Sequence, residues 1–164
     1  MPLHKTYINK NFGFTLVEIL IVIALFTMIA VLIPMIDPAV YTRQLLHNEQ
    51  KELITTLYHA RSQAMNTICL SIICTGNLSY GLHIEHNQYT LFQGIVYDPL
   101  DQNNQITLLD NNTHAYGISD VVFIEFSGDT YTSPATSSTI MLLTSDGKIS
   151  TTSIGRDGQI NWTQ

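Results

Sequence analysis

FTLVEILIVIALFTMIAVLIPMI, residues 14–36, is the stretch that decides how this chain is organised. Its 23 residues contain a single ionisable side chain, that of Glu18. At roughly 1.5 Å of rise per residue, a helix of this length is about 34 Å long, slightly more than the roughly 30 Å hydrocarbon core of a bilayer. We therefore expect these residues to cross a membrane as a helix.

The rest of the chain has an ordinary globular composition. The whole sequence has 164 residues, of which 12% are charged and 45% are hydrophobic, with 7 Lys+Arg against 13 Asp+Glu. This composition argues against a disordered chain, and the net charge of −6 argues against a general nucleic-acid binder. We expect one globular domain behind the apolar segment and no nucleic-acid partner.

The polar residues 1–13 form a short leader that carries Lys5 and Lys10. By the positive-inside rule these lysines hold the N-terminus in the cytoplasm, so that the rest of the chain is exported. A cleaved secretory signal fits poorly, because the apolar run is too long and Asp37 and Pro38 stand where a cleavage site needs small residues. A permanent signal anchor remains an alternative.

Glu18 is the feature that a plain anchor leaves unexplained. A charged side chain at the middle of a bilayer costs about 2.5–3.5 kcal/mol and less near the interface, so a carboxylate here needs a cation. A cut between Gly13 and Phe14 would create an α-amine four residues before Glu18. Because such an amine has a pKa of about 7.7–8.0, it is largely charged at neutral pH. Cleavage would therefore supply the missing counter-charge.

The string Gly-Phe-Thr-Leu-Val-Glu at residues 13–18, between a short basic leader and an apolar helix, resembles the class III signal of type IV pilins and type II secretion pseudopilins. The resemblance implies that a prepilin peptidase in the inner membrane cuts after Gly13 and methylates Phe14. It also implies that Glu18 pairs with the N-terminal amine of a neighbouring subunit. The implied partners are this peptidase, other pilin or pseudopilin subunits, the inner-membrane assembly platform and membrane lipid.

Two prolines follow the apolar run. Many members of the family have a proline near the twenty-second mature residue, and here Pro34 would be the twenty-first. Because proline removes a backbone donor and clashes with the preceding turn, we expect the helix to kink or to open locally around Ala30 to Pro38. Alternatively, Pro38 marks only the point where the chain leaves the membrane.

The next segment, residues 40–65, has a helical period. A stripe of apolar residues recurs at spacings of 7, 4, 3 and 4, namely Leu46, Leu53, Leu57, Ala60 and Ala64, and it is widened by Leu45, Ile54, Tyr58 and Met65. The charged residues lie mainly off the stripe and indicate a solvated face: Glu49, Lys51, Glu52 and Arg61. Residues 57–65 also resemble the helix end of H-type minor pseudopilins and related minor pilins, which often read Ala-Arg-Ser-x-Ala there.

After Asn66 the apolar period becomes strand-like. We predict strands at Ile68–Cys74, Tyr80–His86, Gln88–Ile95, Gln105–Leu109, Val121–Phe126, Thr139–Thr144, Lys148–Ile154 and Gln159–Trp162. The dipeptides Asp146-Gly147 and Asp157-Gly158 are hairpin signals, and Asn87 separates two short strands. The last three strands should form a meander, and the polar stretch Ser127–Ser138 should be a surface loop.

These elements predict an α+β fold. A long N-terminal helix, with its first half in the membrane, should pack its second half against a mainly antiparallel β-sheet head, because a small sheet needs one face covered. The expected organisation is a leader at residues 1–13, a transmembrane half-helix at 14–36, an amphipathic half-helix at 37–66 and a β-rich head at 67–164.

Cys69 and Cys74 are the two cysteines of the sequence. Export invites a disulfide, but five residues along one continuous strand separate two residues by roughly 16 Å, far beyond what a disulfide spans. We therefore expect buried free thiols, unless a turn brings the two together. Their spacing, without a nearby histidine, does not suit zinc.

We find little sign of catalytic chemistry. The histidines are scattered, and the sequence has no Gly-x-Ser-x-Gly elbow, phosphate-binding loop or HExxH string. We expect no catalytic residue and no cofactor, although folding could still assemble a Ser/His/Asp triad. Some major pseudopilins bind calcium, and Asp98, Asp101 and Asn103 are weak calcium candidates, but a polar turn is the favoured interpretation.

The sequence thus favours a structural role. The expected protein is a minor pilin or pseudopilin of a type IV pilus or a type II secretion pseudopilus. It would reside in the bacterial inner membrane as a single-pass protein with its head outside the cytoplasm, and then in the filament. The alternative is a single-pass, membrane-anchored exported domain with a binding or enzymatic function.

Overall fold

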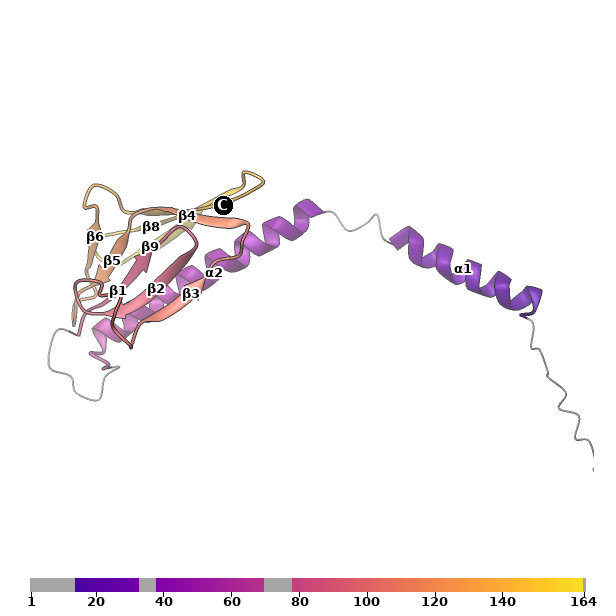
Figure 1. Cartoon of the computed structure of the whole chain (residues 1–164). Helices are drawn as coiled ribbons and strands as arrows, with labels where there is room; N and C mark the ends of the chain where they lie inside the picture. Colours follow the sequence, from indigo (N-terminus) through magenta and orange to yellow (C-terminus); the bar gives the residue numbers. More distant parts are fainter. Residues whose placement is uncertain (1–13, 33–37, 70–77, 164) are drawn as a thin grey trace, which may run out of the picture. The chain divides into compact units, whose positions relative to one another are not determined.

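The structure, a computed structural model, describes residues 14–32, 38–69 and 78–163 (Figure 1). The chain divides into two compact units, Met1–Val40 and Tyr41–Gln164. The first unit contains helix α1 (Leu16–Leu32). The second contains almost all of helix α2 (Pro38–Met65) and every strand of the described residues.

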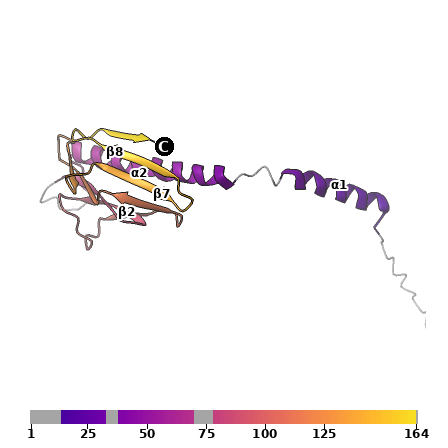
Figure 2. The ribbon, with the colours of Figure 1, turned by 90° about the horizontal axis from the view of Figure 1, so that it is seen from above.

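The strands form two antiparallel sheets. Their bounds are β1 Tyr80–Ile84, β2 Gln88–Gln93, β3 Gln105–Leu108, β4 Thr113–Gly117, β5 Asp120–Phe123, β6 Thr130–Ser133, β7 Thr139–Thr144, β8 Ile149–Ile154 and β9 Ile160–Thr163. The strand orders are β3-β2-β1-β5-β6 and β4-β7-β8-β9. Figure 2 shows α2 running alongside the strands of the head. The predicted α+β class is confirmed.

One face of α2 is the helical side of the core. The five residues of the predicted stripe are between 0% and 6% exposed: Leu46, Leu53, Leu57, Ala60 and Ala64. They belong to one apolar cluster with strand residues from both sheets, such as Leu82 of β1 and Leu142 of β7. The predicted stripe is therefore confirmed, and it is the layer on which the sheets pack.

The opposite face of the first sheet is also partly covered. A Cβ atom at Gly81 would lie 2.3 Å from the ring of Phe92, so only glycine lets this ring rest on β1. Phe92 is 1% exposed, and the ring of Tyr97 lies 5.5 Å from it, measured between centroids. The segment after β2 thus folds back over the sheet.

The predicted meander is confirmed, since β7, β8 and β9 are consecutive neighbours. Gly147 and Gly158 in the predicted turns have positive φ angles of 83° and 74°, which glycine adopts without strain. Two strands were not predicted. They are β4, and β6, which lies inside the polar stretch Ser127–Ser138 that we expected to be a loop. Both are edge strands, which explains their weak apolar alternation.

The described residues form helices α1 and α2, and most of the segment where we expected a kink or a local opening, residues 33–37, lies outside them. α1 ends at Leu32 and α2 begins at Pro38. Proline fits the first position of a helix, because the amide of that residue makes no hydrogen bond within the helix. Pro34, the other predicted kink residue, lies outside the described residues, as does the leader with Gly13.

Candidate functional site

The start of α1 is capped by its own sequence. The amide of Glu18 donates a hydrogen bond to Oγ1 of Thr15 at 3.3 Å, and the amide of Ile19 donates to the carbonyl of Thr15 at 3.2 Å. Thr15 is therefore the N-cap, and Glu18 is the third helical residue, as in a capping box. The Thr-x-x-Glu pattern before an apolar run could have revealed this, and our sequence analysis missed it.

This geometry changes the account of Glu18. A carboxylate in the first turn of a helix is stabilised by the partial positive charge of that helix terminus. The helix thus supplies part of the counter-charge that we had expected an α-amine to supply. Phe14, which would become the N-terminal residue, directly precedes the N-cap and is 77% exposed. Glu18 therefore lies at the end of the helix where that amine would be.

Apart from Glu18 and Thr27, the described side chains of α1 form an apolar surface. Large hydrophobic side chains between Leu16 and Ile29 are between 44% and 76% exposed. A helix that is apolar all round needs an apolar environment on every side. In the part of the chain that the structure describes, no helix has both the length and the apolar character needed to cross a membrane.

Residues 98–104 make a hydrogen-bonded turn. Oδ1 of Asp98 accepts the amide of Leu100, and Oδ1 of Asp101 accepts the amide of Asn103, both at 2.9 Å. The side chain of Asn103 donates to the same Asp101 oxygen at 2.9 Å. The side chains of Asp101 and Asn103 therefore bond to each other, and the side chain of Asp98 bonds to the backbone. Among the residues described here, no group of three or more His, Cys, Asp or Glu could hold a metal ion.

The expectation of free thiols is wrong. Cys69 is disulfide-bonded, and the sequence contains one other cysteine, Cys74, which is not among the described residues. We had expected one continuous strand from Ile68, but Ile68 and Cys69 are not in a strand. They follow a turn in which Thr67 has a φ of 49°. Without an extended strand, the 16 Å separation that we had calculated does not apply.

Serine, histidine and aspartate do meet at one point, between β1 and β5. Nδ1 of His83 lies 2.7 Å from Oδ1 of Asp120, while Nε2 lies 3.6 Å from Oε1 of Glu85. The hydroxyl of Ser119 donates to Oδ2 of Asp120 at 2.9 Å. The serine thus bonds to the carboxylate and not to the imidazole, which is not the arrangement of a nucleophile with its general base.

Two charged residues of α2 are engaged by distant loops. Nη2 of Arg61 donates to the carbonyl of Asp157 at 3.1 Å, and Oε1 of Glu49 accepts the amide of Asp110 at 3.2 Å. Burial raises the pKa of Glu49 above its ordinary value, and this amide hydrogen bond opposes the shift. The prediction of a solvated charged face is therefore wrong for these two residues, because loops far away in the sequence reach them.

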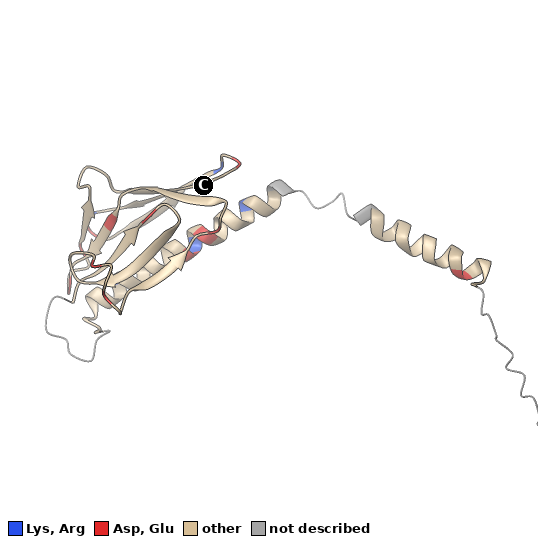
Figure 3. Ribbon diagram, in the orientation of Figure 1, with Lys and Arg blue, Asp and Glu red and all other residues tan. Residues whose placement is uncertain are grey.

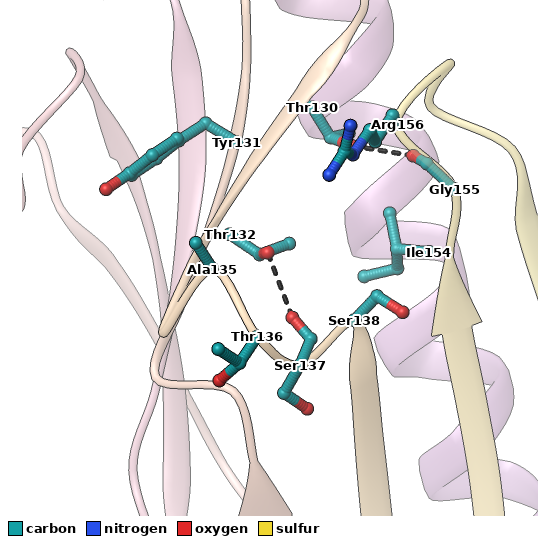
Figure 4. Close-up of a pocket in the computed structure, with 10 residues that line it drawn as sticks. All are labelled: Thr130, Tyr131, Thr132, Ala135, Thr136, Ser137, Ser138, Ile154, Gly155 and Arg156. Atoms are coloured by element: carbon teal, nitrogen blue, oxygen red, sulfur yellow. Dashed lines mark hydrogen bonds between the residues drawn. The ribbon is translucent and has the colours of Figure 1, made fainter.

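Arg156 forms part of the wall of a pocket of about 430 Å³ between β6 and the end of β8 (Figure 4). Oγ1 of Thr130 donates to the carbonyl of Gly155 at 2.6 Å, and Oγ1 of Thr132 donates to the carbonyl of Ser137 at 2.9 Å. These hydroxyls hold the walls of the pocket together. Both hydroxyl groups therefore donate their hydrogen bonds to the backbone of the protein itself.

Comparison with known proteins identifies the N-terminal segment. Residues 8–34 match the family model described as the prokaryotic N-terminal methylation motif. No curated protein and no solved structure matches the chain, so the resemblance of residues 57–65 to minor pseudopilins stays a prediction. The match spans the residues around the predicted cut, the capped start of α1 and its apolar length. The chain therefore carries, at residues 8–34, the prepilin-type motif of type IV pilins and pseudopilins.

Proposed function

We propose that the chain is a structural subunit, a minor pilin or pseudopilin, of a type IV pilus or a type II secretion pseudopilus. A prepilin peptidase cuts between Gly13 and Phe14 and methylates Phe14. The single observation that carries the proposal is the match of residues 8–34 to the N-terminal methylation motif. The exposed, largely apolar surface of α1 supports it, because such a helix needs lipid or other apolar helices around it.

Glu18 is proposed to act in assembly. The capped helix end holds Glu18 in the first turn, close in sequence to the amine that cleavage would create. During assembly the α-amine of Phe14 in one subunit pairs with the Glu18 carboxylate of the next. Before assembly the chain resides in the inner membrane as a single-pass protein with its head exported. It then moves into the filament with the help of the assembly platform.

The chain has no catalytic role of its own in this proposal. The arrangement around His83 supports this part, because both ring nitrogens face carboxylates and neither faces the Ser119 hydroxyl. A membrane-anchored exported domain with a binding or enzymatic function is the competing view.

The experiment is to shear surface filaments or pseudopili from cells that make the chain and to probe both the filaments and the membranes. A subunit is recovered in the filament fraction, and its recovery there is lost in cells without prepilin peptidase. A chain that stays wholly in the membrane fraction, with or without the peptidase, would support the competing view.

A further inference from the structure

A second pocket, of about 270 Å³, lies at the first turns of α2. It is lined by Arg43, Leu46, His47, Lys148 and Ile149, all of which belong to the second unit. Figure 3 shows basic positions both on the early turns of α2 and on the turn between β7 and β8. The pocket therefore joins residues that lie more than a hundred positions apart in the sequence.

Polar contacts hold this turn against the helix. Oγ1 of Thr42 donates to Oδ2 of Asp146 at 3.0 Å, and Nζ of Lys148 bonds to the same threonine hydroxyl. Nζ of Lys148 also lies 2.8 Å from Oδ2 of Asp146. The hydrogen bond from Lys148 holds the pKa of Asp146 well below its usual range, so Asp146 stays ionised and keeps the turn in place.

The positive charges at this pocket are opposite in sign to the net charge of the chain without its leader. Without Lys5 and Lys10 of the leader, five basic residues remain against 13 acidic ones, a net charge of −8. Two of these five, Arg43 and Lys148, meet here beside His47. Asp146 neutralises Lys148 in part, whereas Arg43 makes no ion pair with any residue that the structure describes. A guanidinium in this position suits a phosphate, which it can bind through two parallel hydrogen bonds.

The same end of the head also exposes apolar and aromatic groups. Ile149 is 50% exposed in the wall of the pocket, and Tyr41, near the start of α2 and outside the pocket lining, is 68% exposed. Tyrosine side chains are enriched at the interface between a membrane and water, where arginine and lysine extend their charged ends toward the headgroups. A phosphate ester with an attached apolar part therefore matches the pocket better than a bare anion.

We propose that this pocket binds the phosphate of an anionic phospholipid headgroup, in the membrane that anchors the chain before assembly. The inference rests on the proposed function, since it requires the head to remain at a membrane surface. The order of the sequence favours this occupant, because only five residues separate α1 from α2 and Arg43 lies in the second turn of α2. Bound there, the lipid would hold an acidic head at an anionic surface in one orientation.

The test uses the full chain in nanodiscs of phosphatidylglycerol mixed with phosphatidylcholine, and in nanodiscs of phosphatidylcholine alone. Hydrogen exchange of peptides covering residues 40–49 and 145–150 is followed by mass spectrometry. At an anionic-lipid concentration about ten times the dissociation constant, the amides of these peptides should exchange about tenfold more slowly than in nanodiscs of phosphatidylcholine alone. High salt should remove the effect, because it screens exposed charges.

The variant Arg43→Gln should lose the dependence on anionic lipid while the head stays folded. Arg156→Gln is the matched control, because Arg156 is an exposed arginine outside this pocket and should keep the dependence. Equal exchange in both kinds of nanodisc would overturn the proposal. Protection that increases with the number of protein chains per nanodisc would also overturn it, because it would indicate contact with a second copy. The same holds if free glycerol phosphate, added to phosphatidylcholine nanodiscs, protects these peptides as well as the anionic lipid does.

The mass of the N-terminus, measured on the same protein after expression with the peptidase, separates the two proposals. A chain that starts at Phe14 but shows no lipid-dependent protection removes the lipid site and leaves the pilin function standing. A chain that keeps its leader but shows lipid-dependent protection removes the pilin function and leaves the lipid site standing.

Discussion

Replacing Leu57 with alanine tests whether α2 is the layer that stabilises both sheets. Leu57 is 0% exposed and belongs to the apolar cluster that includes residues of both sheets. The substitution removes three carbon atoms, a loss of about 2.4 kcal/mol at roughly 0.8 kcal/mol for each buried CH₂ group. The cavity that remains adds to this cost, so we expect the free energy of unfolding to fall by about 3–4 kcal/mol.

The assay is urea unfolding of the full chain in detergent micelles, followed by the fluorescence of Trp162, the single tryptophan, which lies on β9. Tyr58→Ala is the matched control, because Tyr58 is the next residue of the helix and is 45% exposed. We expect it to cost less than about 1 kcal/mol. If Leu57→Ala cost no more than Tyr58→Ala, the helix would not be the layer on which the sheets pack.

Three further substitutions and one binding measurement test other parts of the structure. Gly13→Leu should insert normally, because insertion depends on apolar length, but the peptidase should not cleave it, and mature-sized protein should be absent on a gel. Glu18→Ala should insert at least as well as the native chain, because a carboxylate is lost from the apolar segment, and immunoblots of sheared filaments should contain little of it. Glu49→Gln should raise the Tm at pH 7 but not at pH 4. Burial raises the pKa of Glu49 in the folded protein. Protonated Glu49 therefore stabilises the fold below the ordinary carboxyl pKa, and this stability is lost as the pH rises through the raised pKa. Glutamine stays neutral at both pH values, so it should stabilise the fold only where Glu49 is ionised. The head should not bind DNA in a gel-shift titration at low salt, because the chain without its leader is acidic, with a net charge of −8.

Each of these has a result that contradicts it. Mature protein from Gly13→Leu would remove the proposed cleavage site. Normal incorporation of Glu18→Ala would contradict the pairing of Glu18 with the N-terminus of a neighbouring subunit. If the Tm difference between Glu49→Gln and the native chain were equal at pH 7 and pH 4, the effect would not arise from the ionisation of Glu49. Salt-sensitive micromolar DNA binding that Arg156→Ala abolishes would show that net charge had misled us.

The sequence predicted the parts of the fold that have a clear period. The stripe from Leu46 to Ala64 follows the 3.6-residue helical repeat, and the stripe alone indicates which face of α2 is buried. Gly147 and Gly158 mark turns because few other residues adopt a positive φ without strain. Both signals are local, so they can be read without knowing what packs against them.

What the sequence did not predict depends on contacts between distant segments. Arg61 and Glu49 lie off the apolar stripe, yet loops near residues 157 and 110 reach them. Arg43 and Lys148 line one pocket although they are far apart in the sequence, and Asp146 and Lys148 both bond to Thr42 on the helix. The capping of α1 by Thr15 is a different case, because its Thr-x-x-Glu signal was present in the sequence and was missed.

The central claim, that the chain is processed as a pilin-like subunit, is tested most directly by the intact mass of the native protein. The account predicts a mature chain that begins at Phe14 and carries one methyl group on its α-amine. An unprocessed chain that begins at Met1, or a chain cut beyond Ala39, would contradict the account.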